Sequence, residues 1–335
     1  WAAMVDMGWT GIIIPEQYGG SGLGYLTFGV VLEEIGRQLA ASPLFASALV
    51  GASAVLLAGS EAQKQAWLPR IADGSAILTL AVDEGAQHSP EKIALVAEKT
   101  ATGFTLRGSK TFVHEGMAAT GFVVAARTSG SAGDEQGITL FLVAADAMGV
   151  DRQRVRNIDS RGYATVNFND VQIDEGSVLG SVGDGFSQLD AILDRARAGL
   201  GAEMLGTGGQ AFDMTLDYLK TRKQFGQLIG SFQALGHRAA GLFSEMELAR
   251  SCVEAALIAI DDADEANIPQ LCSLSKAKIG AFLHRMSNQL IQIHGGIGMT
   301  DEFDAGFYLK RARVVEASFG NQSYHRNRYA TLLGF

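Results

Sequence analysis

The period of the hydrophobic pattern changes twice along the chain, and this constrains the fold more than any other feature. In residues 1–75, apolar residues such as Phe28, Val31, Leu32 and Ile35 recur at the spacing of one helix face. Residues 76–178 hold short β-prone runs separated by Gly, Ser, Asn and Asp. Helical spacing returns in residues 179–335. The order predicts an α+β protein with a helical domain, a compact β domain of the barrel or sandwich type, and a helical bundle.

Individual elements follow from the same patterns. Strands are predicted at 77–82, 104–106, 122–126, 138–143 and 165–168. Helices are predicted at 63–71, 184–221, 276–293 and 307–317, and apolar residues stepping by three or four from Leu242 to Ile260 indicate another. The helix at 184–221 would be roughly 55 Å long at 1.5 Å per residue.

Composition narrows the possible functions. The 335 residues carry a net charge of −9, which disfavours nucleic acids and anionic membrane surfaces as partners. The two cysteines lack metal-ligand spacing, and no apolar run approaches the ~20 residues of a membrane-spanning helix. No signal peptide is visible, so a cytoplasmic protein without membrane insertion is predicted. Because the chain opens at Trp1 in mid-element, we expect an N-terminal piece to be missing.

A basic and aromatic run follows the long predicted helix. It reads Arg222-Lys223-Gln224-Phe225-Gly226, with Phe232-Gln233 shortly after it. The planar donor fork of an arginine suits a phosphate, and a glycine lets the backbone approach a ligand closely. A solvated helix end with basic residues near the helix dipole explains the same pattern. The residues alone leave both interpretations open.

A glycine-rich segment, Gln292-Ile293-His294-Gly295-Gly296-Ile297-Gly298-Met299-Thr300, follows the helix predicted at 276–293. Its glycines favour a loop whose backbone amides lie against a planar or charged ligand. A tight turn between two helices is the alternative. The segment is not a GxGxxG motif after a strand, so a Rossmann site is disfavoured.

Two segments of the β region end in polar, glycine-bearing loops: Val82-Asp83-Glu84-Gly85-Ala86, and Lys110-Thr111-Phe112-Val113-His114-Glu115-Gly116. Both are compatible with the lining of a cofactor and with ordinary hairpins. Motifs of serine hydrolases, phosphate-loop enzymes and zinc proteases are absent from the sequence.

Four stretches together resemble the acyl-CoA dehydrogenase superfamily over essentially the whole chain. They are Ile14-Pro15-Glu16-Gln17-Tyr18-Gly19-Gly20-Ser21-Gly22; Glu33-Glu34-Ile35-Gly36-Arg37; Tyr218 with Arg222 to Gly226 and Phe232-Gln233; and Ile293 to Thr300. The resemblance implies an N-terminal helical domain over 1–75, a central β domain over 76–178 and a C-terminal four-helix bundle over 179–335.

The same resemblance implies a cofactor, a substrate and partners. The cofactor would be FAD and the substrate would be an acyl-CoA thioester. The electron acceptor would be an electron-transfer flavoprotein. The protein would assemble as a homo- or hetero-oligomer, either a dimer or a tetramer. The FAD of a neighbouring subunit would be contacted by residues of the bundle, namely Arg222, Phe225, Gln233, Gln292, Gly295 and Gly296. The flavin would be lined from the β domain by Val82, Asp83, Phe112 and His114.

The β segments depart from the family pattern. Family members generally have Thr-Glu-Pro-Gly where this chain has Asp83-Glu84-Gly85-Ala86, and Trp-Ile-Thr-Asn where it has Phe112-Val113-His114-Glu115. A carboxylate at Asp83 disfavours a ring that becomes anionic on reduction, unless His114 or another cation offsets it.

Both positions from which family members take the catalytic base lack a carboxylate. They correspond to Ala196, in the long helix, and to Phe319, before Gly320. Arg197 follows Ala196 where the family often has an arginine, and it would contact the substrate. Nearby carboxylates are weak candidates for the base. They are Asp194, about 200° around the helix from Ala196; Glu203, seven residues on and roughly 10 Å along the axis; and Glu316, three residues before Phe319.

Three hypotheses follow from the missing base. The chain is the base-lacking subunit of a heteromeric dehydrogenase, as in some actinobacterial family members that act on steroid side chains. Alternatively, it is a homomeric dehydrogenase with a relocated base. The third hypothesis is a non-catalytic subunit that binds acyl-CoA or serves as a scaffold.

Overall fold

The computed structural model describes residues 1–335 and confirms the predicted α+β class, with helical regions on either side of a β region. The chain divides into two compact units. The first, here the β unit, holds residues 1–28 and 42–196. The second, here the bundle unit, holds residues 29–41 and 197–335, so most of one N-terminal helix belongs with the C-terminal helices.

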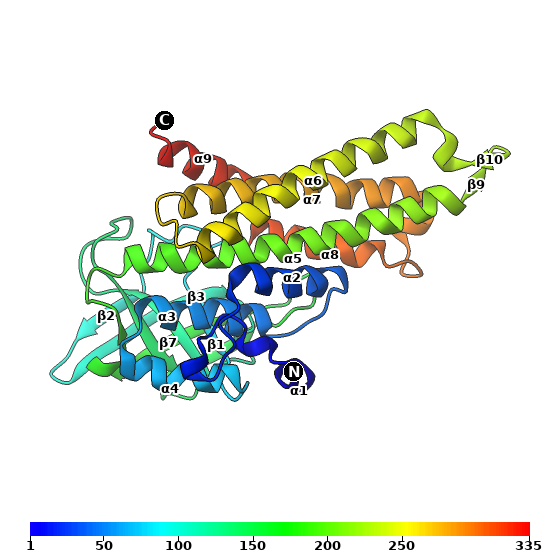
Figure 1. Ribbon diagram of the computed structural model, residues 1–335. Helices are drawn as coiled ribbons and strands as arrows, with labels where there is room; N and C mark the ends of the chain where they lie inside the picture. Colours follow the sequence, from blue (N-terminus) through cyan, green and yellow to red (C-terminus); the bar gives the residue numbers. More distant parts are fainter. The chain divides into compact units, whose positions relative to one another are not determined.

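The N-terminal part of the β unit is helical (Figure 1). It contains α1 (Ala2–Asp6), η1 (Trp9–Gly11), η2 (Glu16–Tyr18), the first turn of α2 (Gly24–Arg37), η3 (Leu44–Gly51), α3 (Ala52–Ala58) and α4 (Glu61–Ala72). The segment η3 is a π-helix in which every residue is buried, because apolar residues surround it on all sides. Helix α4 begins with a capping box between Ser60 and Gln63.

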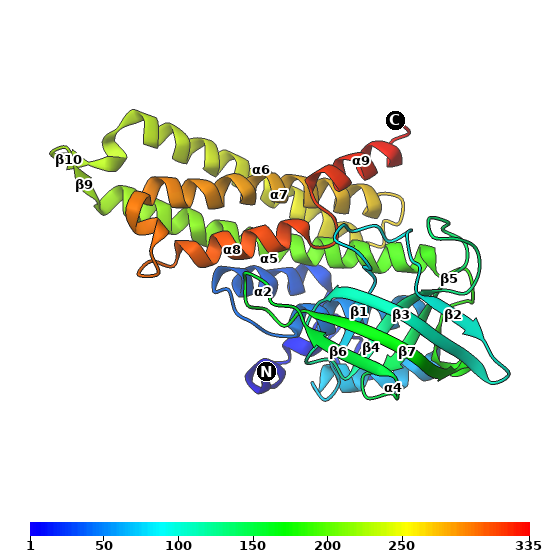
Figure 2. The same cartoon turned by 180° about the vertical axis from the view of Figure 1, so that it is seen from behind.

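One sheet forms the centre of the β unit, and Figure 2 shows its face. Its strands are β1 (Leu78–Ala81), β2 (Val96–Lys99), β3 (Gly103–Val113), β4 (Gly121–Arg127), β5 (Ile138–Ala144), β6 (Val150–Arg154), β7 (Ala164–Asp174) and β8 (Val178–Leu179), with η4 (Glu175–Ser177) before the last. They follow the order β6-β7-β3-β2-β4-β5-β8, with β1 parallel to β4 off that path. All five predicted strands exist; β2, β6 and β8 lie outside the prediction.

The sheet buries an aromatic core and one guanidinium. Phe104 meets Phe141 edge to face at 5.1 Å between ring centroids. Arg127, only 6% exposed, directs all its N–H donors to backbone carbonyls, those of Glu91, Ile93, Ser129, Asp134 and Gln136. A buried arginine is stable here because each donor is satisfied.

Long helices build the bundle unit (Figures 1 and 2). They are α2 from Gly29 onward, α5 (Phe186–Thr221) from Arg197 onward, α6 (Gln233–Asp261), α7 (Ile268–His294), α8 (Ala305–Ala317) and α9 (Gln322–Leu332). Short elements connect them: β9 (Lys223–Gln224), β10 (Gln227–Leu228), η5 (Ile229–Ser231) and η6 (Gly295–Met299). The predicted long helix is confirmed, with 36 residues in α5. No helix in residues 1–335 combines the length and apolarity needed to cross a membrane.

Helices α2 and α5 touch backbone to backbone. A Cβ added to Gly36 would lie 2.0 Å from the carbonyl oxygen of Glu203, and one added to Gly206 would lie 1.8 Å from that of Glu33. Thr207 Oγ1 donates a 3.3 Å hydrogen bond to the carbonyl of Gly36 across the contact. Gly36, the glycine of the Glu-Glu-Ile-Gly-Arg motif, is therefore required because the two helices are too close at this point for any side chain.

We expect the substitution Gly206→Ala to destabilise the fold by about 1–3 kcal/mol or more, the range for forcing a group into a closed core, because its methyl would overlap a carbonyl that belongs to a helix. Gly236→Ala in α6 is the matched control, since its Cβ meets nothing within 4 Å. It should be neutral, or stabilising by up to about 1 kcal/mol through helix propensity. Urea unfolding followed by circular dichroism measures both; equal stabilities for the two variants would contradict the crossing.

Candidate functional site

A hairpin follows the end of α5 and presents the predicted phosphate-binding run. Strands β9 and β10 pair antiparallel, and the two residues between them, Phe225 and Gly226, have φ angles of 51° and 79°. Positive φ at both central residues is the geometry of a tight hairpin turn, which explains the glycine. The Ile229 amide donates to the carbonyl of Arg222 at 2.9 Å and closes the hairpin base. Phe225 is 89% exposed at the tip, so no residue of its own chain covers it.

The glycine-rich segment begins where α7 ends. Gly295 has φ 62° and ψ −134°, a backbone conformation reserved for glycine, and η6 follows as a short 3-10 helix where we had predicted a loop. A Cβ added to Gly295 or Gly296 would meet nothing within 4 Å. Packing within the chain therefore does not require a glycine at position 296, and the open backbone there leaves room for another group to approach.

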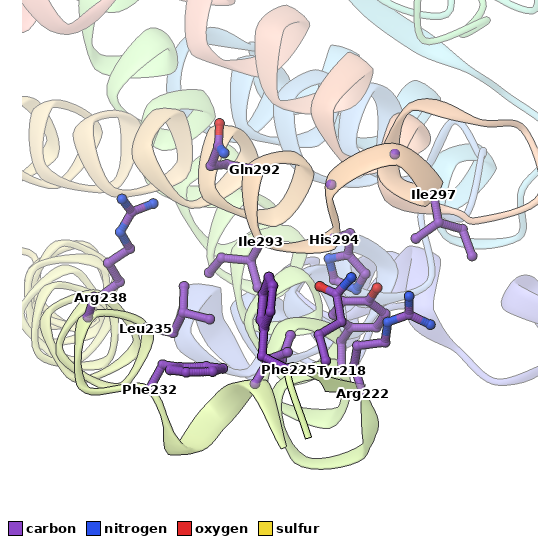
Figure 3. Close-up of a pocket in the computed structure, with 15 residues that line it drawn as sticks. Tyr218, Arg222, Phe225, Phe232, Leu235, Arg238, Gln292, Ile293, His294 and Ile297 are labelled. Carbon is purple, nitrogen blue, oxygen red and sulfur yellow. The ribbon is translucent and has the colours of Figure 1, made fainter. Parts of the chain in front are cut away.

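These two segments enclose a cavity of about 690 Å³, here called the bundle-end pocket (Figure 3). Five of the six bundle residues predicted to contact the cofactor line it: Arg222, Phe225, Gln292, Gly295 and Gly296. The sixth, Gln233, begins α6 and is not among the lining residues, although its neighbours Phe232 and Ala234 are. The pocket is also lined by residues that sequence reasoning did not assign, including Tyr218, Leu235, Arg238, His294 and Ile297.

The bundle-end pocket is electrostatically positive in an acidic chain. Figure 3 shows Arg222 and Arg238 at opposite sides of it, with Phe225 between them, and no carboxylate lines it. Arg238 Nη1 donates to Gln289 Oε1 at 3.2 Å, which leaves its other donors available. The Arg222 side chain has no hydrogen-bond or ion-pair partner in the chain. Two arginines and exposed glycine amides form a donor set that suits a phosphate or pyrophosphate.

The two predicted cofactor segments of the β unit lie beside each other. The amide of Thr111 donates to the Asp83 carbonyl at 2.7 Å, and Lys110 Nζ donates to the Val82 carbonyl at 2.9 Å and to Glu84 Oε1 at 2.6 Å. Burial lowers the pKa of Lys110, while the Glu84 carboxylate opposes that shift. The structure therefore brings Val82 and Asp83 next to the strand that leads to Phe112 and His114.

The side chains of this β cluster differ from what the sequence suggested. The Asp83 carboxylate contacts His88 Nδ1 at 2.9 Å, so its partner is His88 rather than His114. The His114 ring instead lies edge-on to Tyr163, 4.8 Å between centroids, and 5.7 Å from Phe45. Phe112 has a φ of 50° at an irregularity of the β3–β7 pairing and is 43% exposed. His88 follows Asp83 by only five residues, and this short spacing is the one feature of the sequence that could have predicted their contact.

Neither family base position carries a group that could accept a proton. Ala196 is fully buried in α5, and Phe319 is 8% exposed between α8 and α9, with a φ of 54°. Arg197, also fully buried, donates to the Tyr324 hydroxyl at 3.2 Å, and its guanidinium lies over the Tyr324 ring.

Two of the three alternative carboxylates are held by cations. Glu203, 2% exposed, accepts from Arg311 Nε at 2.9 Å and from Arg311 Nη2 at 2.6 Å. Glu316 contacts His284 Nδ1 and Arg313 Nη1, each at 3.0 Å. The third, Asp194, is 1% exposed in the first part of α5.

The corner between α8 and α9, residues 315–320, is held by two buried residues that sequence reasoning missed. Lys276 Nζ donates to the carbonyls of Val315, Glu316 and Gly320 at 2.9, 3.2 and 3.1 Å. His325 Nε2 lies 2.9 Å from the Phe319 carbonyl. Together they clamp the corner at which family members carry the base, with Phe319 in its place.

Comparisons with known proteins identify one family along nearly the whole chain. Three family models match: the N-terminal domain of acyl-CoA dehydrogenase over residues 1–75, the middle domain over 82–175 and the C-terminal domain over 183–333. The probable acyl-CoA dehydrogenase YngJ of Bacillus subtilis is 31% identical over 334 residues, covering 96% of this chain and 86% of that protein.

Two solved structures illustrate the likeness in three dimensions. Butyryl-CoA dehydrogenase from Megasphaera elsdenii superposes with a TM-score of 0.92 at 25% identity, covering 99% of this chain and 88% of that one. A chain of the ChsE4-ChsE5 complex from Mycobacterium tuberculosis superposes with a TM-score of 0.87 at 28% identity, covering 99% and 87%. The resemblance drawn from the four sequence stretches is confirmed.

The clamp at residues 315–320 makes stability depend on pH. Burial lowers the pKa of Lys276 to about 7, whereas a free lysine has a pKa of ~10.4. Between these values the unfolded chain holds a proton that the folded protein has released, so stability should rise with pH. Relative to Lys276→Met, the free energy of unfolding should rise by about 1.4 kcal/mol per pH unit. Urea unfolding at pH 7 and pH 9 measures it. The control Lys278→Met, on the same helix, should leave the pH dependence of the free energy of unfolding unchanged. If the difference in that free energy between the unaltered protein and Lys276→Met is the same at pH 7 and pH 9, Lys276 does not lose its proton on folding.

Proposed function

Because the chain belongs to the acyl-CoA dehydrogenase family, we propose that it is a subunit of a heteromeric enzyme that desaturates an acyl-CoA thioester and takes its catalytic base from another chain. The family function itself is an oxidoreductase reaction on a CH–CH bond, and the cofactor is FAD. The absence of a carboxylate at both base positions, Ala196 and Phe319, carries the proposal.

The bundle-end pocket fits the nucleotide portion of FAD. A pyrophosphate needs clustered donors and no nearby carboxylate, and Arg222, Arg238 and the Gly295–Gly296 backbone meet that need. The exposed Phe225 ring offers a flat apolar surface to an adenine or ribose. When bound, FAD would supply the acceptor for the hydride removed from the substrate. This chain would contribute binding and orientation of the dinucleotide, with Arg222 and Arg238 as the cations for its phosphates.

The β cluster would face the isoalloxazine ring, by the family likeness. The Asp83 carboxylate would then face the ring while already hydrogen-bonded to His88 Nδ1, at 2.9 Å. That contact gives the carboxylate a partner within the chain.

Removal of the α-proton requires a carboxylate within hydrogen-bond reach of the substrate. The ion pair with Arg311 fixes the direction of the Glu203 carboxylate, and Glu316 is bound to His284 and Arg313. Either carboxylate would have to break these contacts before it could turn toward a substrate. Asp194 lies two residues from Ala196 on α5, about 200° around the helix, and is 1% exposed, so service as a relocated base would need a local rearrangement. A base from a second chain needs no such rearrangement.

The structural similarity to a chain of the ChsE4-ChsE5 complex supports a heteromer, because that protein is a complex of two named components. The exposed hairpin tip at Phe225 and the open pocket edge are also compatible with a site completed by another chain. A dimeric or tetrameric assembly, an electron-transfer flavoprotein as acceptor, the domain boundaries near 75 and 178, and a cytoplasmic location stay predictions.

We expect Arg222→Ala to weaken FAD binding by about 1.5–3 kcal/mol, or roughly 10- to 150-fold in Kd, because a charged donor to the phosphates is lost. The matched control is Lys223→Ala, which removes the adjacent cation from β9 outside the pocket lining. FAD fluorescence quenching on titration gives both dissociation constants. Equal Kd values for Arg222→Ala and the unaltered protein would remove Arg222 from the cofactor site.

Anaerobic titration with a panel of acyl-CoAs tests the source of the base. With FAD present, the flavin absorbance band near ~450 nm should not bleach when the chain alone is titrated with any acyl-CoA, because hydride transfer needs prior or concerted α-proton removal. Bleaching is expected only after the subunit encoded beside it is added. If the chain bleaches alone, the heteromer proposal fails, and Asp194→Asn, Glu203→Gln and Glu316→Gln identify the relocated base.

A further inference from the structure

A line of four exposed side chains, here called the α6 stripe, follows the outer face of α6 at the border of the bundle unit (Figures 1 and 2). Phe243 and Ile258 form its ends and are 51% and 43% exposed. Glu247 and Glu254 lie between them, and both are exposed. At about 100° per residue, the four positions fall within about 60° of one another around the helix, over about 22 Å of its length. The stripe therefore has apolar ends and an acidic middle.

The two glutamates of the α6 stripe are not neutralised within the chain. The Glu254 side chain has no ion-pair or hydrogen-bond partner. Glu247 Oε1 lies 3.7 Å from Arg250 Nε, but Arg250 Nη1 already donates to the Glu33 carboxylate at 3.0 and 3.2 Å. The middle of the stripe therefore carries net negative charge.

A second copy of this chain does not fit the α6 stripe. Identical helices related by a two-fold axis run either parallel or antiparallel, and each arrangement must be self-complementary. In the parallel arrangement, Glu247 and Glu254 would each meet their own counterparts. In the antiparallel register that sets Phe243 against Ile258, Glu247 would meet Glu254, because both pairs are centred on the same point of the helix. Each arrangement brings like charges together, which is destabilising.

We infer that the α6 stripe is the docking surface for a different chain, the second subunit of the proposed heteromer, and that the facing helix of that subunit carries lysine or arginine between apolar residues. The inference rests on the proposed function, because it takes a heteromeric assembly, and it adds the surface and the charge of the partner. Phe243 and Ile258 supply apolar contacts to the facing helix. Glu247 and Glu254 attract a basic partner and repel a second copy, so they decide which chain binds.

Exchanging one charge should make the α6 stripe self-complementary. In Glu247→Lys the antiparallel pairing sets each lysine against Glu254 of the second copy, twice by symmetry, and Glu254→Lys gives the reverse pairs. Either variant should lower the Kd of self-association about tenfold relative to the unaltered chain. In the double variant lysine meets lysine, so the Kd should return to the unaltered value. Sedimentation velocity of the full chain measures all four proteins at about 0.05 M and about 0.5 M salt, and the gain should shrink at the higher concentration.

The same variants should bind the second subunit less tightly. With the subunit encoded beside this chain, biolayer interferometry should give a Kd about tenfold higher for Glu247→Lys and for Glu254→Lys, and a larger loss for the double variant. The control Glu135→Lys, in an exposed loop of the β unit, makes the same charge change and should leave both associations unaltered. Contacts elsewhere in the assembly are shared by all variants, so they cancel in the comparison.

The outcomes distinguish this inference from the proposed function. Self-association that stays unchanged in both single variants, or that is as tight in the double variant as in the single ones, would overturn the inference. An unchanged Kd for the second subunit would do the same. If the flavin still bleaches only when that subunit is present, the proposed function stands and the two chains meet through another surface. If the chain bleaches alone, the proposed function fails, and the partner assigned to the α6 stripe falls with it.

Discussion

The backbone contact between α2 and α5 is the constraint on which the rest of the bundle unit depends. Gly36 and Gly206 let the two helices approach until carbonyl oxygens occupy the space of missing side chains. At that separation the flanking polar residues reach neighbouring helices. Glu33 pairs with Arg250 on α6, Arg37 pairs with Asp213 on α5, and the Tyr308 hydroxyl of α8 donates to the Arg37 carbonyl. The Glu-Glu-Ile-Gly-Arg motif is thus a joint that ties four helices together.

The contact between α2 and α5 also limits which carboxylate could act as the catalytic base. The carbonyl that Gly36 accommodates belongs to Glu203, whose side chain pairs with Arg311 of α8. The Glu203 side chain cannot turn toward a substrate without breaking this buried ion pair. Removing one partner of a buried ion pair costs several kcal/mol, roughly 3–5 by mutational experience. The nearest buried carboxylate along α5 from Ala196 in the C-terminal direction is therefore structural, which leaves fewer candidates for a relocated base.

The hydrophobic periodicity of the sequence predicted most helices and strands, but it did not predict the contacts of the buried polar side chains. The long α5, α7 and the central strands follow from apolar spacing, and the glycines of the hairpin and of the segment after α7 marked real backbone requirements. The π-helix η3 was missed because its apolar residues run all round and carry no period. Lys276 binds the carbonyls of Val315 and Gly320, 39 and 44 residues away, and Arg127 binds that of Glu91, 36 residues away. Contacts this distant in the sequence leave no local pattern. The pairing of Asp83 with His88 has a weak signal in its spacing of five residues, but whether the pair forms depends on how one loop folds back.

Two buried basic side chains, those of Arg127 and Lys276, hold backbone segments in place. Each directs its donors to backbone carbonyls, and Lys276 does so at the corner that corresponds, by the family likeness, to one of the two base positions. A buried polar group is tolerable only when its partners are present, so these contacts limit the freedom of the corner to move. The clamped corner and the bundle-end pocket, whose lining includes none of residues 315–320, together favour a subunit that binds the cofactor while another chain performs the proton transfer.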